Sequence, residues 1–344
     1  MESFKVVCIG GFGHLTDVLD DMVGMANVRF VGYAPAYIGE DLEQVKRHEL
    51  CKGSVRFYED FRQMLKKTRP RLAIVSTRLD LIAPVATEAA GFGCHLICEK
   101  PLAIDYDQLD NLYAAVKTNR VSIMAMFSMR RWPAFIAARN ACLSGQTGEI
   151  ILVNARKSYK WGQRPPSFAR RDTYGGTIGW VGIHALDMIR YMTARQFTSA
   201  AAMQSNFAHK DFGDCEDNCV LILGLDNGGH ATVSVDIFRP EAASTWGDDW
   251  IRIVGTKAVI EANGTANFCN LLTEQGESKS LSLGEPGKTY YHFISRLIED
   301  KDNREISEDS FMLTYSCLCA RDAADKGIIQ PVVRKFIFDS ASVQ

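Results

Sequence analysis

The chain has 344 residues, of which 47% are hydrophobic and 23% are charged, and its formal net charge is −2. These values are typical of a globular protein of two ordinary domains, and the near-neutral charge argues against a nucleic-acid partner. The sequence contains no apolar run long enough to span a bilayer and no signal-peptide pattern at its start, so we expect a cytoplasmic protein without a membrane partner.

The first third of the chain alternates short apolar runs with amphipathic stretches. The apolar runs predict strands at 4–9, 28–33, 72–76, 96–98 and 121–126. The amphipathic stretches predict helices at 15–26, 42–50, 61–66, 81–90 and 108–117. Strands that alternate with helices form a parallel sheet with right-handed crossovers. The pattern therefore predicts an α/β fold, with a doubly wound, nucleotide-binding parallel sheet over residues 1–124.

The pattern changes after residue 124. A helix is predicted at 133–143, and alternating segments then predict strands at 150–157, 198–206, 218–225, 230–237, 250–254 and 258–262. The segment from Leu225 to His230 carries Asn227-Gly228-Gly229, which is typical of a hairpin turn. Helices are predicted at 290–299 and 309–326. Residues 125–344 are therefore predicted to form an α+β domain with a mainly antiparallel sheet.

Three pairs of the ten cysteines stand close together in the sequence, but none has the Cys-x-x-Cys spacing of zinc ribbons or redox motifs. Most of the cysteines lie in apolar segments, where cysteine behaves as a small hydrophobic residue. Disulfides are not expected in a chain without a secretory signal. We therefore expect reduced thiols and no metal site.

A glycine-rich segment follows the first predicted strand and opens the first predicted helix. It comprises Gly10, Gly11, Phe12, Gly13 and His14. Glycines let the backbone approach a diphosphate, and a helix N-terminus favours its negative charge. Thr16 stands where a third glycine normally allows tight packing between helix and strand. The segment predicts dinucleotide binding, and a simple turn is the alternative.

The end of the second predicted strand leaves the identity of the dinucleotide open. NAD-binding proteins normally carry an acidic residue there for the ribose hydroxyls, but this chain has Ala34. NADP would require a nearby basic residue, and none precedes Lys46 and Arg47. The missing acid disfavours NAD, and the missing basic residue disfavours NADP. The sequence therefore predicts NAD or NADP as the cofactor and does not distinguish between them.

Two further segments carry candidate catalytic groups. Glu99-Lys100-Pro101 follows an apolar strand, where lysine offers a cation of adjustable pKa; a surface lysine is the alternative. His184 follows a glycine-rich turn and shares a helix face with Trp180 and Asp187. A histidine can act as general base near neutral pH, although a packed core histidine gives the same pattern.

Aromatic and basic residues cluster before His184. The cluster comprises Tyr159, Lys160, Trp161, Arg164, Arg170, Arg171 and Tyr174, and a second group surrounds Trp246 and Trp250. Indole rings stack on sugar faces, and arginine binds carboxylates, so these residues suit an acidic sugar or a bulky glycoside. Exposed loops and oligomer interfaces are also enriched in these residue types, and that alternative stays open.

Together these motifs make the chain similar to the Gfo/Idh/MocA oxidoreductases, a family named for glucose–fructose oxidoreductase and inositol dehydrogenase. The resemblance runs nearly end to end. It rests on the glycine segment, on Glu99-Lys100-Pro101, on Met129-Arg130-Arg131, on the run from Ser144 to Ile150 and on the run from Gly175 to His184. It implies a Rossmann domain and a second domain with a large open-faced sheet. That second domain would bind substrate and form homodimers or homotetramers.

The resemblance also implies an activity, which is NAD(P)-dependent oxidation or reduction of a carbinol of a sugar, sugar acid or cyclitol. Lys100 would lie beside the nicotinamide and the reacting hydroxyl, and His184 would take the hydroxyl proton. The cofactor-binding set would comprise residues 10–14, Thr77, Arg78, Glu99 and Lys100. The substrate-binding set would comprise Tyr159, Trp161, Arg170, Trp180 and Asp187.

Three positions depart from the family pattern. Trp180 stands where the family has an aspartate four residues before the histidine, and Leu79 stands where it often has an asparagine after the third strand. Ala34 is the third departure. These changes leave two alternatives open. One is a non-catalytic relative that binds a sugar or a partner, and the other is a glycosidase that uses bound NAD for transient oxidation.

Overall fold

The structure is a computed structural model that describes residues 3–53, 55–276 and 278–338. The chain forms two compact units, which are described separately below. The first comprises residues 1–126, 288–314 and 335–344, and the second comprises residues 127–287 and 315–334. The domain boundary between residues 124 and 125 that the sequence pattern suggests stays a prediction.

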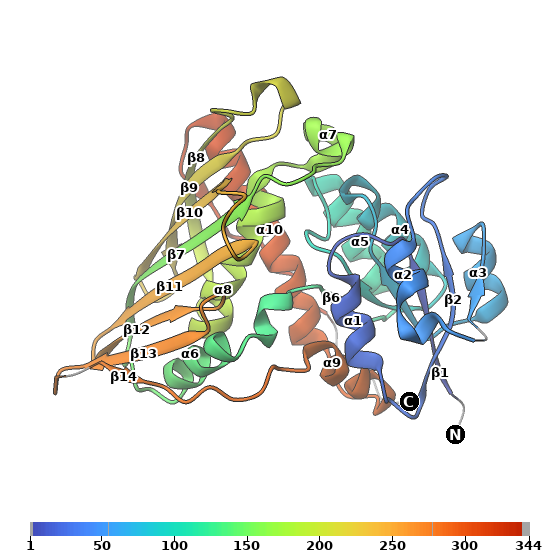
Figure 1. Ribbon diagram of the computed structural model, residues 1–344, viewed down its shortest axis with the longest axis horizontal. Coiled ribbons are helices and arrows are strands. Elements are labelled where there is room, and N and C mark those ends of the chain that lie inside the picture. The colour runs from blue at the N-terminus through green and yellow to red at the C-terminus, as the bar shows by residue number, and fades with distance from the viewer. Residues whose placement is uncertain (1–2, 54, 277, 339–344) are drawn as a thin grey trace. The chain divides into compact units, whose positions relative to one another are not determined.

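Within its described residues, the first unit contains a six-stranded parallel sheet (Figure 1). Its strands are β1 (Phe4–Ile9), β2 (Val28–Ala34), β3 (Arg56–Phe57), β4 (Leu72–Val75), β5 (His95–Cys98) and β6 (Ile123–Ala125). They lie in the order β3-β2-β1-β4-β5-β6. This order reverses direction between β1 and β4, which is where doubly wound sheets bind dinucleotides. The predicted parallel, doubly wound sheet is confirmed.

Helices and one 3-10 turn cover this sheet. They are α1 (Leu15–Met22), α2 (Glu43–Arg47), η1 (Glu49–Cys51), α3 (Phe61–Thr68), α4 (Leu79–Gly91), α5 (Tyr106–Thr118) and α9 (Thr289–Ile298). Asp105 begins α5, because its carboxylate accepts the backbone N–H of Gln108 at 2.8 Å. The buried Asp21 of α1 accepts the backbone N–H of Tyr290 at 3.0 Å and so anchors the start of α9.

Over its described residues, the second unit contains a nine-stranded sheet in the order β14-β13-β12-β11-β7-β10-β9-β8-β15 (Figure 1). The strands are β7 (Ile150–Lys160), β8 (Phe197–Ser205), β9 (Asn218–Leu225), β10 (His230–Arg239), β11 (Gly247–Gly255), β12 (Ala258–Asn263), β13 (Phe268–Thr273), β14 (Lys279–Ser280) and β15 (Gln330–Pro331). Neighbouring strands are antiparallel except β7 and β10, which are parallel. The predicted α+β unit with a large, mainly antiparallel sheet is confirmed.

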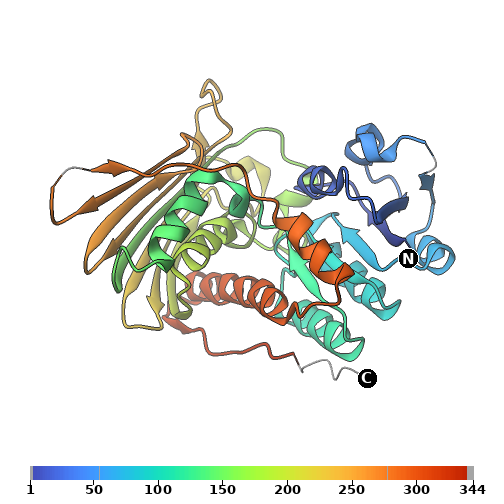
Figure 2. The same ribbon diagram turned by 90° about the horizontal axis from the view of Figure 1, so that it is seen from below.

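One face of this second sheet is covered by helices (Figure 2). The helical segments of the unit are η2 (Ser128–Arg131), α6 (Pro133–Leu143), η3 (Pro166–Ala169), α7 (Arg171–Tyr174), η4 (Ile178–Gly182), α8 (Ile183–Thr193), η5 (Lys210–Phe212) and the end of α10 (Arg304–Lys326). Helix α6 packs on β12 and β13, and α8 packs on β7, β10 and β11. Alternate residues of β7, such as Val153 and Ala155, are buried beneath them.

No helix among residues 3–53, 55–276 and 278–338 is both long enough and apolar enough to cross a membrane.

Candidate functional site

The glycine segment forms a tight loop between β1 and α1. Gly10 has φ +90° and Gly13 has φ +73°, a backbone conformation that residues with a side chain rarely adopt. A Cβ at Gly10 would collide with the carbonyl of Ser76, just after β4. The backbone N–H of Phe12 donates to that same carbonyl at 2.9 Å. The loop is therefore fixed against the carboxyl end of β4, at the point where the strand order reverses.

Glu99 lies directly beneath the same loop. A Cβ at Gly13 would collide with its carboxylate, which accepts the backbone N–H of His14 at 2.6 Å. The His14 ring nitrogen Nδ1 lies 2.9 Å from the other carboxylate oxygen. Burial alone would raise the pKa of Glu99, but the His14 ring, its hydrogen bonds and Lys100 together hold that pKa below its ordinary value. Glu99 is thus an anion that fixes the glycine loop from within.

Lys100 is a buried lysine and not a surface one, since only 1% of it is exposed. Strand β5 ends at Cys98, and the next residues turn away from the sheet edge through a cis bond between Lys100 and Pro101. The Lys100 Nζ lies 3.9 Å from a Glu99 carboxylate oxygen, and its backbone N–H donates to that oxygen at 3.1 Å. A desolvated ammonium next to a carboxylate, at the carboxyl end of a parallel strand, is suited to bind a polar group of a ligand.

Glu40 is a functional candidate that the sequence pattern did not reveal. Its carboxylate accepts the backbone N–H of Ala36 at 2.6 Å and the hydroxyl of Thr77. Burial raises the pKa of Glu40, and the hydrogen bonds from Thr77, Ala36 and Tyr37 only partly oppose this rise. The chain after β2 thus bends back and brings a carboxylate to the edge where Ala34 provides none. The spacing gave no signal, because this acid lies six residues beyond the expected position.

Arg78 lies at the same edge of the first sheet. Its guanidinium donates to both carboxylate oxygens of Asp80, at 2.6 and 2.8 Å, and lies 5.2 Å from the centre of the Tyr37 ring. Arg78 is therefore an oriented cation beside Thr77 and Glu40, at the end of β4 where the adenosine end of a dinucleotide would lie.

His184 lies in the second unit, at the start of α8. It is 1% exposed, and it follows the π-helical turn η4, a rare geometry that is frequent at functional sites. Asp187, one turn further along, accepts from the Arg130 Nε at 2.8 Å, and this buried carboxylate fixes the helix. Trp180 is half-buried within η4 and meets the Phe168 ring edge-on, with centroids 5.6 Å apart.

A hydrogen-bonded network fixes the turn before His184. The Thr177 backbone N–H donates to the buried carboxylate of Glu216 at 3.0 Å, and Arg171 pairs with the same carboxylate. Arg171 also donates to Asp325 of α10 at 3.1 Å, and Arg321 donates to the carbonyl of Gly175 at 2.9 Å. Sequence reasoning did not identify Glu216, because its partners lie far from it along the chain.

The remaining substrate candidates lie at the end of β7, which contains Tyr159, and on the segment that follows it, which contains Trp161 and Arg170. Tyr159 covers the buried Lys157, whose Nζ lies 4.4 Å from its ring centre. The Trp161 ring stacks on His209, with centroids 3.6 Å apart and planes within 1°. Arg170 is exposed and pairs with Asp172 through its Nε at 2.9 Å. Trp161 and Arg170 therefore already have close partners within the protein.

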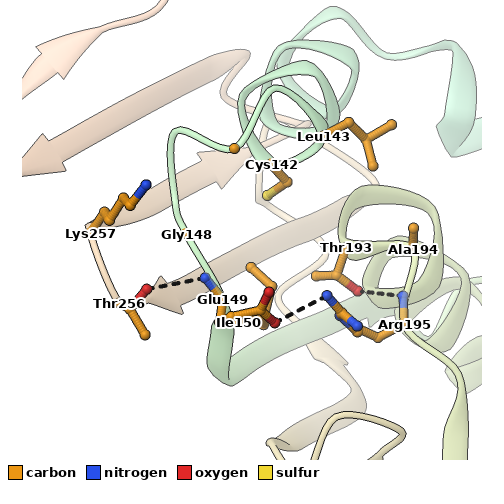
Figure 3. A pocket seen from close by; sticks show the side chains of 11 residues that line it. Cys142, Leu143, Gly148, Glu149, Ile150, Thr193, Ala194, Arg195, Thr256 and Lys257 are labelled. Carbon is orange, nitrogen blue, oxygen red and sulfur yellow. Dashed lines mark hydrogen bonds and ion pairs between the residues drawn. The ribbon is translucent and has the colours of Figure 1, made fainter.

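A cavity of about 520 Å³ opens between the ends of α6 and α8 and the turn from β11 to β12 (Figure 3). Thr256 accepts the Glu149 backbone N–H at 3.1 Å, and Arg195 pairs with the Glu149 carboxylate at 3.3 Å. The residues that line this cavity include none of the predicted catalytic, cofactor-binding or substrate-binding residues.

Disulfides and metal clusters depend on the cysteines and the other metal-ligating side chains of the described residues. None of the ten cysteines, all of which the structure describes, forms a disulfide. In the described ranges, no group of three or more histidine, cysteine, aspartate or glutamate side chains is arranged to hold a metal ion.

The structure thus brings the predicted residues together in two sets. In the first unit, the glycine loop, Thr77, Glu99 and Lys100 lie at the carboxyl ends of neighbouring parallel strands. In the second unit, Trp180, His184 and Asp187 lie on one continuous helical segment. Lys100 and His184 belong to different units, and their joint action stays a prediction.

Two family models match the chain. One, described as an oxidoreductase family with an NAD-binding Rossmann fold, matches residues 37–127. The other, described as the GFO/IDH/MocA C-terminal domain, matches residues 135–261.

Relatives of known name match over most of the chain. The rhizopine catabolism protein MocA of Rhizobium meliloti is 24% identical over 239 residues, which cover 67% of this chain and 73% of that protein. The 2,7-anhydro-N-acetylneuraminate hydratase of Escherichia coli is 25% identical over 307 residues, which cover 88% of this chain and 76% of that protein.

Solved structures match over nearly the whole chain. A Thermotoga maritima protein described as an oxidoreductase has a TM-score of 0.88 and 33% identity, covering 95% of this chain and 99% of that one. Levoglucosan dehydrogenase in complex with NADH has a TM-score of 0.80 and 19% identity, covering 96% and 100%, and shows the shared fold.

Proposed function

The chain belongs to the Gfo/Idh/MocA family of NAD-binding oxidoreductases, and from this premise we propose that it is a nicotinamide-dependent dehydrogenase. Its substrate would be a carbinol of a sugar, sugar acid or cyclitol, as the name of levoglucosan dehydrogenase suggests for a relative of the same fold. The observation that carries the proposal is the buried Glu99–Lys100 pair beneath the positive-φ glycine loop.

The residues around this loop fit a dinucleotide. The loop precedes the eight-residue helix α1 at the reversal point of a parallel sheet, so its backbone N–H groups and the helix dipole suit a diphosphate. Gly11 and Gly13 would hold the diphosphate through their backbone N–H groups, since the Phe12 N–H already donates to the carbonyl of Ser76. Thr77, Arg78 and Glu40 would hold the adenosine end, and Lys100 would lie beside the nicotinamide.

The chemistry is divided between the two sets of residues. When bound, the nicotinamide supplies the group that accepts or donates a hydride. The ammonium of Lys100 would donate a hydrogen bond to the reacting hydroxyl and lower its pKa. A ring nitrogen of His184 would take the hydroxyl proton on oxidation and return it on reduction. The Arg130–Asp187 pair would hold α8, and thereby His184, in position.

We further propose that NAD is preferred over NADP. Glu40 supplies the carboxylate that is missing at Ala34, since it is fixed at the same sheet edge by Ala36 and Thr77. Ribose hydroxyls can donate hydrogen bonds to this carboxylate. A 2′-phosphate would place further negative charge beside this carboxylate and be repelled, because the neighbouring Arg78 guanidinium is already paired with both oxygens of Asp80.

Titration with NADH and NADPH tests both proposals. We expect NADH to bind about tenfold more tightly than NADPH or better, which is about 1.4 kcal/mol of discrimination. Glu40→Gln removes the negative charge and should narrow the difference in affinity between NADH and NADPH. The control Glu43→Gln, at a residue in an exposed pair with Lys46 and Arg47, should leave that difference unchanged. Tighter binding of NADPH would contradict the role of Glu40. Binding of neither would contradict the proposed function.

The outer face of the second sheet supports a proposal of self-association. Met203 of β8 lies opposite Val220 of β9, and both are exposed, as are Ile222, Ile151 and Leu272 on the same sheet. An apolar face of this kind is usually covered by a partner. We propose that a second copy covers it, giving a homodimer or homotetramer.

Light scattering after gel filtration checks this prediction. The mass of the purified protein should be two or four times 38.3 kDa. Ile222→Glu places a charge on the face and should shift the mass towards that of one chain, whereas Lys52→Glu on an exposed loop of the first unit should not. A wild-type mass of one chain would contradict self-association.

A second candidate function is favoured by the hydratase relative, which matches 88% of this chain. Trp180 stands where the family has an aspartate, so the group beside the proposed base differs from the family's. The candidate reaction adds or removes a group through transient oxidation of the sugar by bound NAD. Product analysis separates the two reactions. Addition or removal of a group through transient oxidation converts the substrate with no net change in the amount of NADH, whereas a dehydrogenase that oxidises its substrate accumulates NADH.

A further inference from the structure

Two of the four basic residues in the cluster before His184 are already paired with carboxylates of the protein. Arg170 pairs with Asp172, and Arg171 pairs with Glu216 and Asp325. Arg170 uses two of its N–H groups on one carboxylate and Arg171 is held by two carboxylates, so each has fewer donors left for a ligand. These two residues are therefore poor choices for binding an acidic substrate.

Arg164 differs from them. Within the part of the chain that the structure describes, it makes no hydrogen bond and no ion pair. The residue as a whole is only half-buried, whereas its Nε is fully buried and has no acceptor among the described residues. Native proteins rarely leave a buried donor unsatisfied, and such a group calls for an explanation, of which a ligand is one.

Aromatic rings hold Arg164 without using its donors. Its guanidinium carbon lies 4.8 Å from the centre of the Trp161 ring and 5.8 Å from that of Phe168. Cation–π contacts of this kind use none of the N–H donors of a guanidinium. The group is thus oriented and charged, with its hydrogen-bonding edge still available for a planar anion.

The surroundings of Arg164 make it rigid and connect it to the candidate site. Trp161 stacks on His209, whose Nδ1 lies 3.1 Å from the buried Asp217. On the other side, Phe168 meets Trp180 with ring centroids 5.6 Å apart. Only one aromatic ring therefore separates Arg164 from Trp180, which lies one helical turn before His184.

We propose that Arg164 binds a carboxylate of the substrate, so that this protein acts on sugar acids in preference to the matching neutral sugars. This inference rests on the proposed function, since it assigns a substrate class to the same site. The guanidinium and a carboxylate are both planar and can form two parallel hydrogen bonds. The carboxylate would satisfy the donors of Arg164, and the sugar ring would lie towards Trp180.

Calorimetric titration with matched sugars tests the proposal. The probes are D-glucuronate against D-glucose and D-galacturonate against D-galactose, each with the wild-type protein in the presence of NADH. We expect at least one acid to bind about tenfold more tightly than its neutral partner, as for a charge-assisted hydrogen bond. Arg164→Gln should abolish the preference and Arg164→Lys should keep part of it. Arg252→Gln, in an exposed pair with Glu261, should leave the preference unchanged.

The outcomes separate this inference from the proposed function. Equal or weaker binding of every acid, or an unchanged preference in Arg164→Gln, would overturn the role of Arg164. If NADH binds in the same samples, the proposed function survives that result. A preference for acids that depends on Arg164, in a protein that binds no NADH, would sustain the role of Arg164 and overturn the dehydrogenase.

Discussion

Replacing Lys100 with methionine is expected to lower the rate of hydride transfer by about a thousandfold or more, with the fold intact. Lys100 is 1% exposed, and methionine fills a similar volume without the charge. Its ammonium is the cation that would stabilise the developing alkoxide, and removal of such a group typically costs about 10²–10³ in kcat, with more if proton transfer is also lost. The rate is read as the change in absorbance of NADH in a single turnover.

Two controls make this result specific. Lys66→Met removes an exposed lysine from α3 and should leave the rate unchanged. NADH binding by Lys100→Met should stay within a few fold of wild type, because the glycine loop is fixed by Glu99 and His14. A Lys100→Met rate close to that of wild type would refute the assigned role of the lysine.

Removing either partner of the buried Lys157–Asp249 pair should destabilise the protein by about 3–5 kcal/mol. Lys157 of β7 and Asp249 of β11 lie directly opposite each other, and both are about 1% exposed. Burial alone would lower the pKa of Lys157, but Tyr159 and Asp249 raise it above its ordinary value. Lys157→Met or Asp249→Asn therefore leaves a buried group without its counter-charge.

Urea unfolding of the two variants measures this loss. Arg156 and Asp248, the neighbouring residues on the same strands, form a partly exposed pair at 2.8 Å. Arg156→Met should cost less than about 1 kcal/mol, because solvent screens that pair. If the buried-pair variants and the exposed-pair variant lost equal free energy of unfolding, the Lys157–Asp249 pair would contribute little to stability.

Long periodic elements of the fold could be predicted from the sequence, whereas short ones could not. The runs that became β1, β4, α4 and α5 are apolar or amphipathic over enough residues to indicate their type. Strands β3, β14 and β15 have two residues each, and their pairing depends on neighbouring strands rather than on their own pattern. The π-helical turn η4 also has no signature, because its sequence alternates small and apolar residues as an α-helix would.

The candidate site divides in the same way. The glycine loop, Lys100 and His184 are found by local motifs, because each lies next to a strand or helix end that the pattern predicts. Glu40 gives no signal in the sequence, because the ribose-binding acid of this fold normally stands at the end of β2, six residues earlier. The pairing of Arg171 with Glu216 depends on residues distant in sequence, and so does the absence of an acceptor for the Arg164 Nε among the described residues.

The central claim is that the glycine loop holds a nicotinamide dinucleotide. A crystal structure of the protein, determined from crystals grown with NADH, tests this claim most directly. We predict the diphosphate against the backbone of Gly11 and Gly13, the adenosine ribose hydroxyls on the Glu40 carboxylate, and the nicotinamide beside Lys100. A structure from millimolar NADH in which this loop binds no nucleotide, or in which NADH lies elsewhere, would contradict the claim.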